Sequence, residues 1–407
     1  MGLFLFLISD IMTSVTEKIK SLAKENLNSV IDIRRHIHAN PELSFNEINT
    51  SAYVVSALNK IGLSAKKIAN TGLVVEIHGK NPGKTIALRA DMDALPIEEW
   101  NEVPYKSKSV GVMHACGHDA HTASLIGAAA ILSELKDEWD GTIKLIFQPG
   151  EEKLPGGATF MIKEGVLDHP APESIFAQHV FPSLEAGKVG FCGGTYMASC
   201  DEIYLTIKGK GGHAAMPASY VNPILIASEI LLELDNVFMK HPKNKIPTVL
   251  AFGKMHANGA TNVIPSELTI EGTFRTMDEA WRAEAHKTIT NIIDSKTKSL
   301  GGDCNIKIEV GYPVLINNEE TTKHARGAAE EYLGKENVVT LEKRMTSEDF
   351  AFYSLLKPCC FYRLGTGNVA KGLTAGVHTP TFDIDESALE TGMGLMAWIA
   401  ISELNRK

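Results

Sequence analysis

The sequence has few cysteines, no cluster of basic residues and no long apolar segment, and each absence excludes a class of protein. Six cysteines spread over 407 residues do not make the disulfide framework of a secreted protein, so we expect a reducing, cytoplasmic environment. The formal net charge is −9 and no lysine- or arginine-rich stretch is present, which argues against nucleic acid as a partner. No apolar stretch approaches the roughly 18 residues that a membrane span needs, so no membrane partner is expected.

The first residues, MGLFLFLISDIM, resemble a secretion signal only in being apolar. No lysine or arginine precedes the apolar part, and Asp10 interrupts it. Ser14 and Glu17 instead form a capping-box pattern, which predicts a helix from about Ser14 to the stop at Asn40-Pro41. Residues 1–12 are therefore expected to be a disordered extension or an upstream misassignment of the start, with Met12 as the true first residue.

Short apolar segments rich in β-forming residues alternate with helix-like segments in the first half of the chain. The strand-like segments are GLVVEIHG (72–79), TIALRAD (85–91), TIKLIF (142–147) and SIFAQHV (174–180). The stretch that begins at Asp119 has the length and the small-residue face of a helix. This alternation predicts an α/β domain with a mostly parallel sheet and helices on both faces.

The middle of the chain has a different order of elements. Strand, helix, strand, strand, helix and strand patterns follow one another at 203–211, 222–240, 247–256, 266–276, 278–302 and 304–311. This β-α-β-β-α-β order is that of a ferredoxin-like α+β fold. The α/β pattern then resumes, with a helix at 319–334, a strand at 359–365 and a helix from Glu386. The expected organisation is a catalytic domain in two parts, 1–192 and 309–407, with a lid or dimerisation domain inserted at 193–308.

The segment MHACGHDAHTA (113–123) carries a cysteine and three histidines in eleven residues. Cys116 and His118 are two residues apart, a spacing that places side chains on one face of an extended segment and on different faces of a helix. The pair is therefore expected on the loop that leads into the helix. A thiolate and an imidazole are good ligands for borderline metal ions. A cysteine near a helix start with two unconnected histidines remains the alternative at this point.

Further acidic and histidine residues lie where the predicted strands end. Asp93 follows the second strand, Glu151 and Glu152 follow the third, His179 ends the fourth, and His378 lies in a polar loop before the last helix. Each is unremarkable alone, but ligands of open α/β sheets bind at the carboxyl ends of the strands. Two adjacent carboxylates can divide their work, one binding metal and the other accepting a proton. Together these residues are sufficient for two metal ions that share a bridging water.

Eight motifs in the right order resemble one branch of a known family. They are RADMDALPIEE, MHACGHDAHTA, FQPGEE, GKGGHAAMP, TNVIP, GTFRT, TSEDFAFY and GVHTPTFDIDE. They look like the hippurate hydrolase and auxin-conjugate hydrolase branch of the metal-dependent aminoacylase–carboxypeptidase family. The resemblance extends from about Ile33 to Glu386.

The resemblance implies a role for individual residues. Five positions match the metal ligands of that branch: Cys116, His118, Glu152, His179 and His378. Glu151 matches the general base, and His213 of the inserted domain matches the histidine that stabilises the oxyanion. Asn262 and Arg275 match positions that hold the substrate's carboxylate or backbone, and Asp93 and Asp119 match residues that orient ligands. Family members commonly dimerise through the inserted domain, so the resemblance implies a homodimer or homotetramer.

The resemblance also implies an activity: hydrolysis of N-acyl amino acids, hippurate-like or N-acetyl, to a carboxylic acid and a free amino acid. The expected cofactors are two divalent ions per subunit, zinc or manganese first and cobalt or nickel as alternatives. The thiolate of Cys116 favours zinc over magnesium or calcium. Three other activities remain open: a carboxypeptidase or dipeptidase acting on short peptides, a metal-binding protein without catalysis, and an enzyme with Cys116 as nucleophile.

Overall fold

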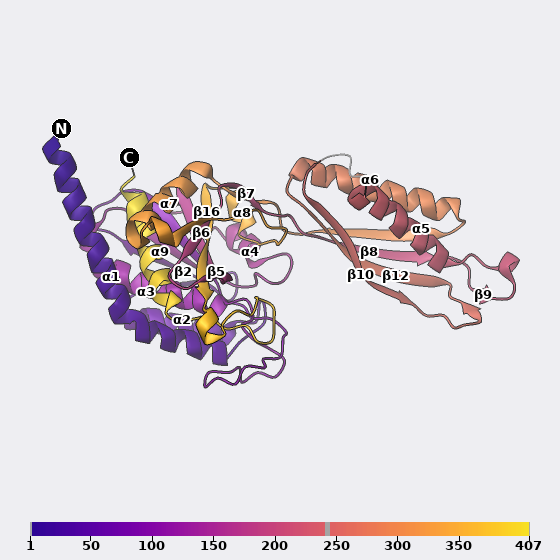
Figure 1. Cartoon of the computed structure of the whole chain (residues 1–407), viewed down its shortest axis with the longest axis horizontal. Coiled ribbons are helices and arrows are strands. Elements are labelled where there is room, and N and C mark those ends of the chain that lie inside the picture. The colour runs from indigo at the N-terminus through magenta and orange to yellow at the C-terminus, as the bar shows by residue number, and fades with distance from the viewer. Residues whose placement is uncertain (1, 241–244, 407) are drawn as a thin grey trace. The chain divides into compact units, whose positions relative to one another are not determined.

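The computed structural model describes residues 2–240 and 245–406, with side chains from Val15 onward, and divides them into two compact units (Figure 1). The first comprises the chain up to Gly194 together with Ile316–Glu342 and the part from Phe352 onward. The second comprises Thr195–Leu315 and Lys343–Ala351. The second unit thus extends beyond the predicted insertion boundary at residue 308 and includes a separate segment that the sequence pattern does not indicate.

The first unit is built on an eight-stranded sheet in the order β1-β2-β4-β3-β5-β16-β6-β15. Its strands are β1 (Lys66–Ile68), β2 (Gly72–His78), β3 (Thr85–Asp91), β4 (Thr142–Gln148), β5 (Ser174–Glu185), β6 (Val189–Phe191), β15 (Val338–Thr340) and β16 (Cys359–Gly367). The four central strands, β4, β3, β5 and β16, are parallel, whereas β2 and β6 run antiparallel to their central neighbours. All seven residues of β3 are buried, as expected for a strand covered on both sides.

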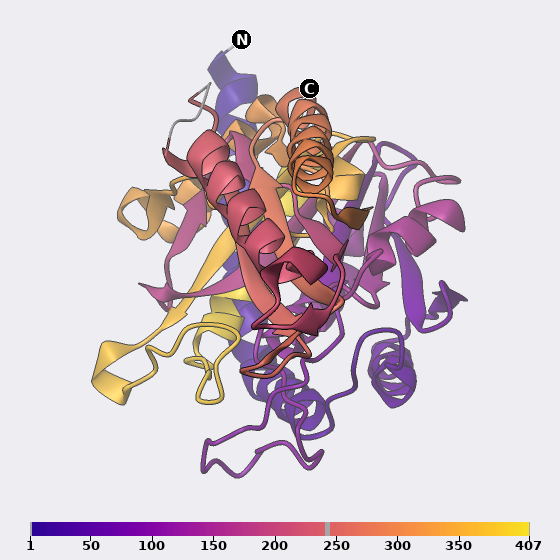
Figure 2. The same cartoon turned by 90° about the vertical axis from the view of Figure 1, so that its right-hand side faces the viewer.

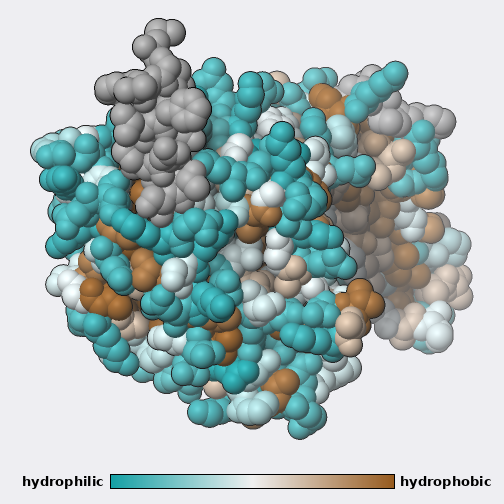
Figure 3. All heavy atoms as spheres, turned by 60° about the vertical axis from the view of Figure 1, so that its left-hand side comes forward, coloured by the Kyte–Doolittle hydropathy of each residue, from teal (hydrophilic) through white to brown (hydrophobic). Residues whose placement is uncertain are grey.

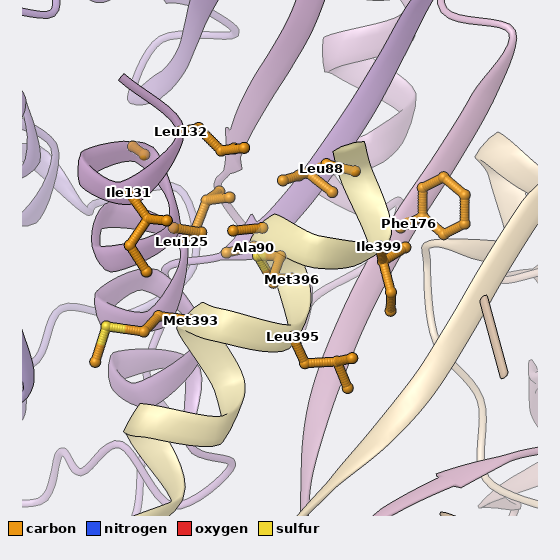
Figure 4. Packing of buried hydrophobic residues seen from close by; sticks show 14 of the residues in the cluster. Leu88, Ala90, Leu125, Ile131, Leu132, Phe176, Met393, Leu395, Met396 and Ile399 are labelled. Carbon is orange, nitrogen blue, oxygen red and sulfur yellow. The ribbon is translucent and has the colours of Figure 1, made fainter. Parts of the chain in front are cut away.

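Helices α1 (Gly2–Ala39), α2 (Ile48–Lys60), α3 (His118–Glu134), α4 (Gly157–Lys163), α7 (Glu319–Leu333), α8 (Ala351–Ser354) and α9 (Ala388–Leu404) accompany these strands. The helices α3 and α9 pack on β3, where Leu125 of α3 and Met396 of α9 lie near Leu88 (Figure 4). Their close approach needs a glycine at position 127, because a Cβ there would lie 2.8 Å from the Met393 sulfur. The face of the first unit seen in Figure 3 is mostly hydrophilic, with small hydrophobic groups.

Two predicted boundaries in this unit differ from the structure. Helix α1 begins at Gly2 rather than near Ser14, although it ends at Ala39 as the Asn40-Pro41 stop predicts. The prediction for residues 1–12 stays a prediction, because Met1 and the side chains of residues 2–14 lie outside the described part. Strand β5 continues to Glu185, so His179 lies within the strand and not at its end. The added residues are partly exposed, so they lack the apolar pattern that reveals a buried strand.

The second unit confirms the predicted ferredoxin-like order. Its main elements are β8 (Asp201–Lys208), α5 (Pro223–Asp235), β10 (Thr248–Ala257), β12 (Glu267–Thr276), α6 (Glu279–Ser299) and β13 (Asp303–Val310). The four strands form an antiparallel sheet in the order β10-β12-β8-β13. Helices α5 and α6 lie side by side across the sheet (Figure 2). Alternate residues of β8, among them Ile203 and Leu205, are buried beneath them, which is the pattern of a sheet covered on one face.

Four short strands form two separate two-stranded sheets. In one, β7 (Gly194–Met197) pairs with β14 (Leu315–Asn317), and in the other β9 (Gly212–His213) pairs with β11 (Val263–Ile264). Among the described residues, no helix combines the length and apolar character needed to cross a bilayer.

Candidate active site

The turn into α3 places Cys116 and His118 beside each other. Gly117 precedes the helix with φ 84°, a left-handed conformation that favours glycine, and a Cβ there would lie 2.5 Å from the side chain of Val180. Cys116 therefore stays in the loop while His118 opens the first helical turn. Both side chains are buried.

The structure brings all five predicted metal ligands together. The Cys116 sulfur lies 3.4 Å from Nε2 of His179 on β5 and 3.3 Å from Nε2 of His378. Oε1 of Glu152 lies 3.1 Å from His378 Nε2 and 3.9 Å from His118 Nε2. These residues come from four separate segments of the chain, which meet at the carboxyl-end edge of the parallel strands as the sequence predicts.

The ligand atoms form two groups that share Cys116. Cys116, His118 and His179 make one group, and Cys116, Glu152 and His378 make the other, with the ligand atoms of each within 4.8 Å of one another. Nε2 of His118 is buried and has no hydrogen-bond partner among the described residues. Buried polar atoms are rarely left unsatisfied, and a cation held between this nitrogen and Glu152 would satisfy it. The donor set of thiolate, imidazole and carboxylate therefore fits divalent metal ions of the zinc type.

Hydrogen bonds fix which nitrogen each histidine presents. His118 donates through Nδ1 to the backbone oxygen of Asp93 at 2.9 Å, with Oδ1 of the same residue at 3.3 Å. His179 donates through Nδ1 to the backbone oxygen of Val180 at 2.8 Å. Nδ1 of each ring is thus occupied by a carbonyl oxygen, which leaves Nε2 of both rings facing the cluster and available to a metal ion.

Asp93 also positions the two adjacent glutamates. Its Oδ1 accepts a hydrogen bond from the backbone amide of Glu151 and its Oδ2 one from that of Glu152, each at 3.0 Å. Glu151 is only 6% exposed and, with Glu152 and His118, forms a third group of closely spaced ligand-type atoms. The carboxylates of Glu151 and Glu152 thus lie side by side in the ligand cluster. This arrangement allows one of them to bind metal while the other accepts a proton.

Protons and metal ions compete for the same atoms in this cluster. Hydrogen bonds to Cys116 and Glu152 raise the pKa of His378 to about 10. Burial raises the pKa of the Cys116 thiol. Metal binding requires a thiolate and a neutral imidazole, so binding must release these protons. His378 is also held in a left-handed backbone conformation, φ 62°, with its amide donating to the Ala115 oxygen at 2.7 Å.

His121 is a site residue to which the sequence did not assign a role. Its Nδ1 lies 2.6 Å from Oδ1 of the buried Asp91, and its Nε2 accepts a hydrogen bond from the Val180 amide at 2.8 Å. Both ring nitrogens are thus occupied, so His121 is not a free ligand and instead anchors β5 next to His179. The sequence feature that could have indicated its place in the site is its spacing from His118, since residues three apart on a helix lie on the same face.

Asp119 makes its hydrogen bonds to helix α1, and its predicted role in orienting a ligand stays a prediction. Its carboxylate accepts hydrogen bonds from Arg34 Nε at 2.7 Å and pairs with His38 Nδ1 at 2.8 Å, both on α1. A fully buried carboxylate is stabilised by a buried guanidinium, and these contacts tie α1 to α3. Asp119 therefore has a role in joining two helices.

The other predicted residues belong to the second unit. His213 lies exposed on β9 and pairs with Val263. The backbone oxygen of Asn262 accepts a hydrogen bond from the Ala214 amide at 3.0 Å, so His213 and Asn262 are close neighbours. Arg275 on β12 donates to the Met345 backbone oxygen at 3.2 Å and to the Ser347 hydroxyl at 3.4 Å. Their roles toward a substrate remain predictions.

Comparisons with known proteins agree with this geometry. Residues 87–401 match the peptidase family M20/M25/M40. The chain is 37% identical to a thermostable carboxypeptidase 2 of Saccharolobus solfataricus over 96% of this chain and 100% of that protein. It is 40% identical to an N-acyl-L-amino acid amidohydrolase of Geobacillus stearothermophilus over 75% of this chain and 82% of that protein.

A solved structure supports the same conclusion. The YXEP protein of Bacillus subtilis, described as a dinuclear metal binding peptidase from the M20 family, superposes with a TM-score of 0.79 at 32% identity. The superposition covers 94% of this chain and 99% of that protein. The resemblance drawn from the eight motifs is thereby confirmed, and the chain belongs to the peptidase family M20/M25/M40.

Proposed function

We propose that this protein is a metal-dependent amidohydrolase that converts N-acyl amino acids to a carboxylic acid and a free amino acid. Two divalent ions would be held by Cys116, His118, Glu152, His179 and His378. The observation that carries the proposal is the convergence of these five ligand residues in two groups that share Cys116, with the carboxylate of Glu151 in the same cluster.

The chain's own residues supply the proton transfers. When bound, the ions would lower the pKa of a water molecule toward neutrality and would polarise the amide carbonyl. Glu151 accepts the proton of that water as the water attacks the carbonyl carbon. Glu151 then delivers the proton to the amine as the C–N bond breaks. His213 is proposed to donate a hydrogen bond to the oxygen that becomes negative.

The choice of metal follows from the ligands. A cysteine thiolate with three imidazoles and a carboxylate favours zinc, because magnesium and calcium prefer oxygen ligands. Manganese, cobalt and nickel are the alternatives.

The proposal also includes the assembly and the location of the protein. We propose a homodimer or homotetramer that forms through the second unit and is located in the cytoplasm.

The substrate is proposed to be small and anionic. Arg275, partly buried on β12, is a candidate anchor for the carboxylate of the amino acid product, and Asn262 for its backbone. The relative from Geobacillus stearothermophilus carries the name of an N-acyl-L-amino acid amidohydrolase, which favours acylated amino acids. The relative from Saccharolobus solfataricus carries the name of a carboxypeptidase, so short peptides are the second candidate.

Hydrolysis assays on chelator-treated protein test the proposal. Hippurate, N-acetylmethionine and unblocked dipeptides are offered before and after zinc, manganese or cobalt is restored. Release of free amino acid from the acylated substrates, only with metal present, is the expected result. Cleavage of dipeptides alone would move the activity to the carboxypeptidase or dipeptidase class. A protein that binds two ions and cleaves neither class would be a metal-binding protein without this catalysis.

A further inference from the structure

The turn that carries Glu151 and Glu152 is held through three successive backbone amides. The amides of Glu151 and Glu152 donate to Asp93, whereas the amide of Gly150 donates to Oε1 of Glu47 at 2.8 Å. Two buried carboxylates, Glu47 and Asp93, therefore determine the path of the turn. Asp93 was expected from the motifs, but nothing in the sequence pattern singles out Glu47.

Glu47 lies immediately before α2 and is fully buried. Its side chain forms no hydrogen bond that caps this helix, although it occupies the capping position. Its Oε1 also accepts from the Phe45 amide at 2.8 Å, and its Oε2 accepts from the Thr71 hydroxyl at 2.7 Å. The carboxylate thus serves the turn at Gly150 and not the helix that it precedes.

Packing reinforces this connection. Gly150 has φ 59°, and a Cβ on it would lie 2.3 Å from the ring of Phe45. The Ser44 hydroxyl donates to Oδ2 of Asp93 at 2.6 Å. The loop of residues 44–47 therefore supplies the Glu47 carboxylate, contacts Asp93 through Ser44 and packs Phe45 against Gly150, so movement of this loop would move the turn with it.

We propose that Glu47 is a positioning residue for the catalytic turn, acting through the Gly150 amide on the placement of Glu151 and Glu152. This inference rests on the proposed function only in naming Glu151 as base and Glu152 as metal ligand. The side chain does not touch the reacting groups. Its acceptor oxygens, more than its negative charge, carry the role, because all three contacts are donated to it.

The same loop provides a matched control. The Glu42 carboxylate accepts the backbone amides of Asn49 at 3.1 Å and Thr50 at 2.8 Å, the Asn49 side-chain amide at 2.8 Å and the Thr50 hydroxyl at 2.9 Å. These contacts serve the start of α2 and none of them reaches the turn. Glu42→Ala therefore removes a comparable set of hydrogen bonds without loosening Glu152.

The test is a titration of chelator-treated protein with Co²⁺, followed by the absorbance that a cysteine-ligated Co²⁺ ion produces, in competition with a chelator. Glu47→Ala is expected to weaken Co²⁺ binding about tenfold to a hundredfold, the usual cost of removing a group that supports a metal ligand. Glu47→Gln keeps an acceptor for Gly150 and can donate to Thr71, so it should bind within about threefold of wild type. Glu42→Ala should bind like wild type.

Equal Co²⁺ affinity in Glu47→Ala and Glu42→Ala would overturn the inference, as would a Gln variant as weak as the Ala variant. If Glu47→Ala does not fold, Glu47→Asp decides, because its shorter side chain cannot reach both Phe45 and Gly150. The Asp variant should weaken binding at least about threefold, and wild-type affinity in it would overturn the inference. Because the readout is Co²⁺ affinity, a wild type that cleaves no N-acyl amino acid would refute the proposed function without deciding the role of Glu47.

Discussion

Asp93 contacts Nδ1 of His118 twice, through its backbone oxygen at 2.9 Å and its carboxylate at 3.3 Å. The same carboxylate accepts the amides of Glu151 and Glu152. In Asp93→Asn, one oxygen becomes an NH₂ group that faces a donor. We expect metal affinity to fall about tenfold to a hundredfold, measured as metal retained after dialysis against a chelator. The exposed Asp137→Asn is the control, and unchanged retention in Asp93→Asn would contradict the assignment.

Glu151→Gln should separate metal binding from proton transfer. The amide keeps the size of the side chain but cannot accept the proton of the attacking water. We expect both ions to be retained while kcat falls about 10²- to 10⁴-fold. Metal analysis and steady-state kinetics on the same preparation give the two quantities. Activity close to that of wild type would remove Glu151 from the role of base.

Cys116→Ser distinguishes a metal ligand from a nucleophile. Serine is a poor ligand for zinc-type ions, so we expect the variant to lose both metal and hydrolysis, and bound metal to protect wild-type Cys116 from alkylation. Cys192→Ser, away from the ligand cluster, should change neither. Metal-free wild type that remains active, and is inactivated by alkylation, would instead establish the cysteine-nucleophile mechanism.

Arg34 and Arg35 are adjacent but should differ in their effect on stability. Arg34 is fully buried and pairs with Asp119 and Asp383, each at 2.7 Å, whereas Arg35 is 44% exposed and pairs with Glu386 at 2.6 Å. Arg34→Met removes the guanidinium from two buried carboxylates, so the free energy of unfolding should fall by about 3–5 kcal/mol. Arg35→Met should cost less than about 1 kcal/mol. Urea unfolding measures both, and equal losses would contradict the buried-charge argument.

Asp385 should contribute stability that disappears in acid. Burial alone would raise its pKa, but hydrogen bonds from Asn368, Lys371 and Ser387 outweigh it and lower the pKa to about 2. Because the folded pKa is below the unfolded value, the carboxylate stabilises the fold above about pH 4 and loses this contribution as the pH falls toward 2. The full contribution is about 2 kcal/mol, and about half is lost by pH 3.

Comparison of wild type with Asp385→Asn checks this pH dependence. The difference in free energy of unfolding between the two proteins should shrink by about 1 kcal/mol from pH 5 to pH 3. A difference that is constant with pH would show that Asp385 does not titrate differently in the folded and unfolded states.

Elements with a strong local pattern were predictable from the sequence. The fully buried β3, with its apolar residues Ile86 to Leu88, and the alternating β8 have patterns of buried and half-buried strands. The order of elements from β8 to β13 specifies the ferredoxin-like fold. The three-residue strands β6 and β15 carry no such pattern, because so short a segment is ordered only by the neighbours it pairs with. The contacts of Asp119 with α1 were not predictable, because adjacent helical residues point about 100° apart and the sequence does not show which helix each of them faces.

The sequence by itself singled out the five candidate ligands and Glu151, because their residue types stand in motifs that resemble those of the family and most of them lie close to predicted strands. Only the tertiary structure decided which nitrogen each histidine presents, that His121 anchors β5, and that Glu47 holds a turn 103 residues away in sequence. These roles depend on buried donors and acceptors that are paired by packing, and a buried polar group is bound to whichever partner the fold brings within about 3 Å. A glutamate in a loop carries no local mark of that partner, so its role becomes visible only once the chain is folded.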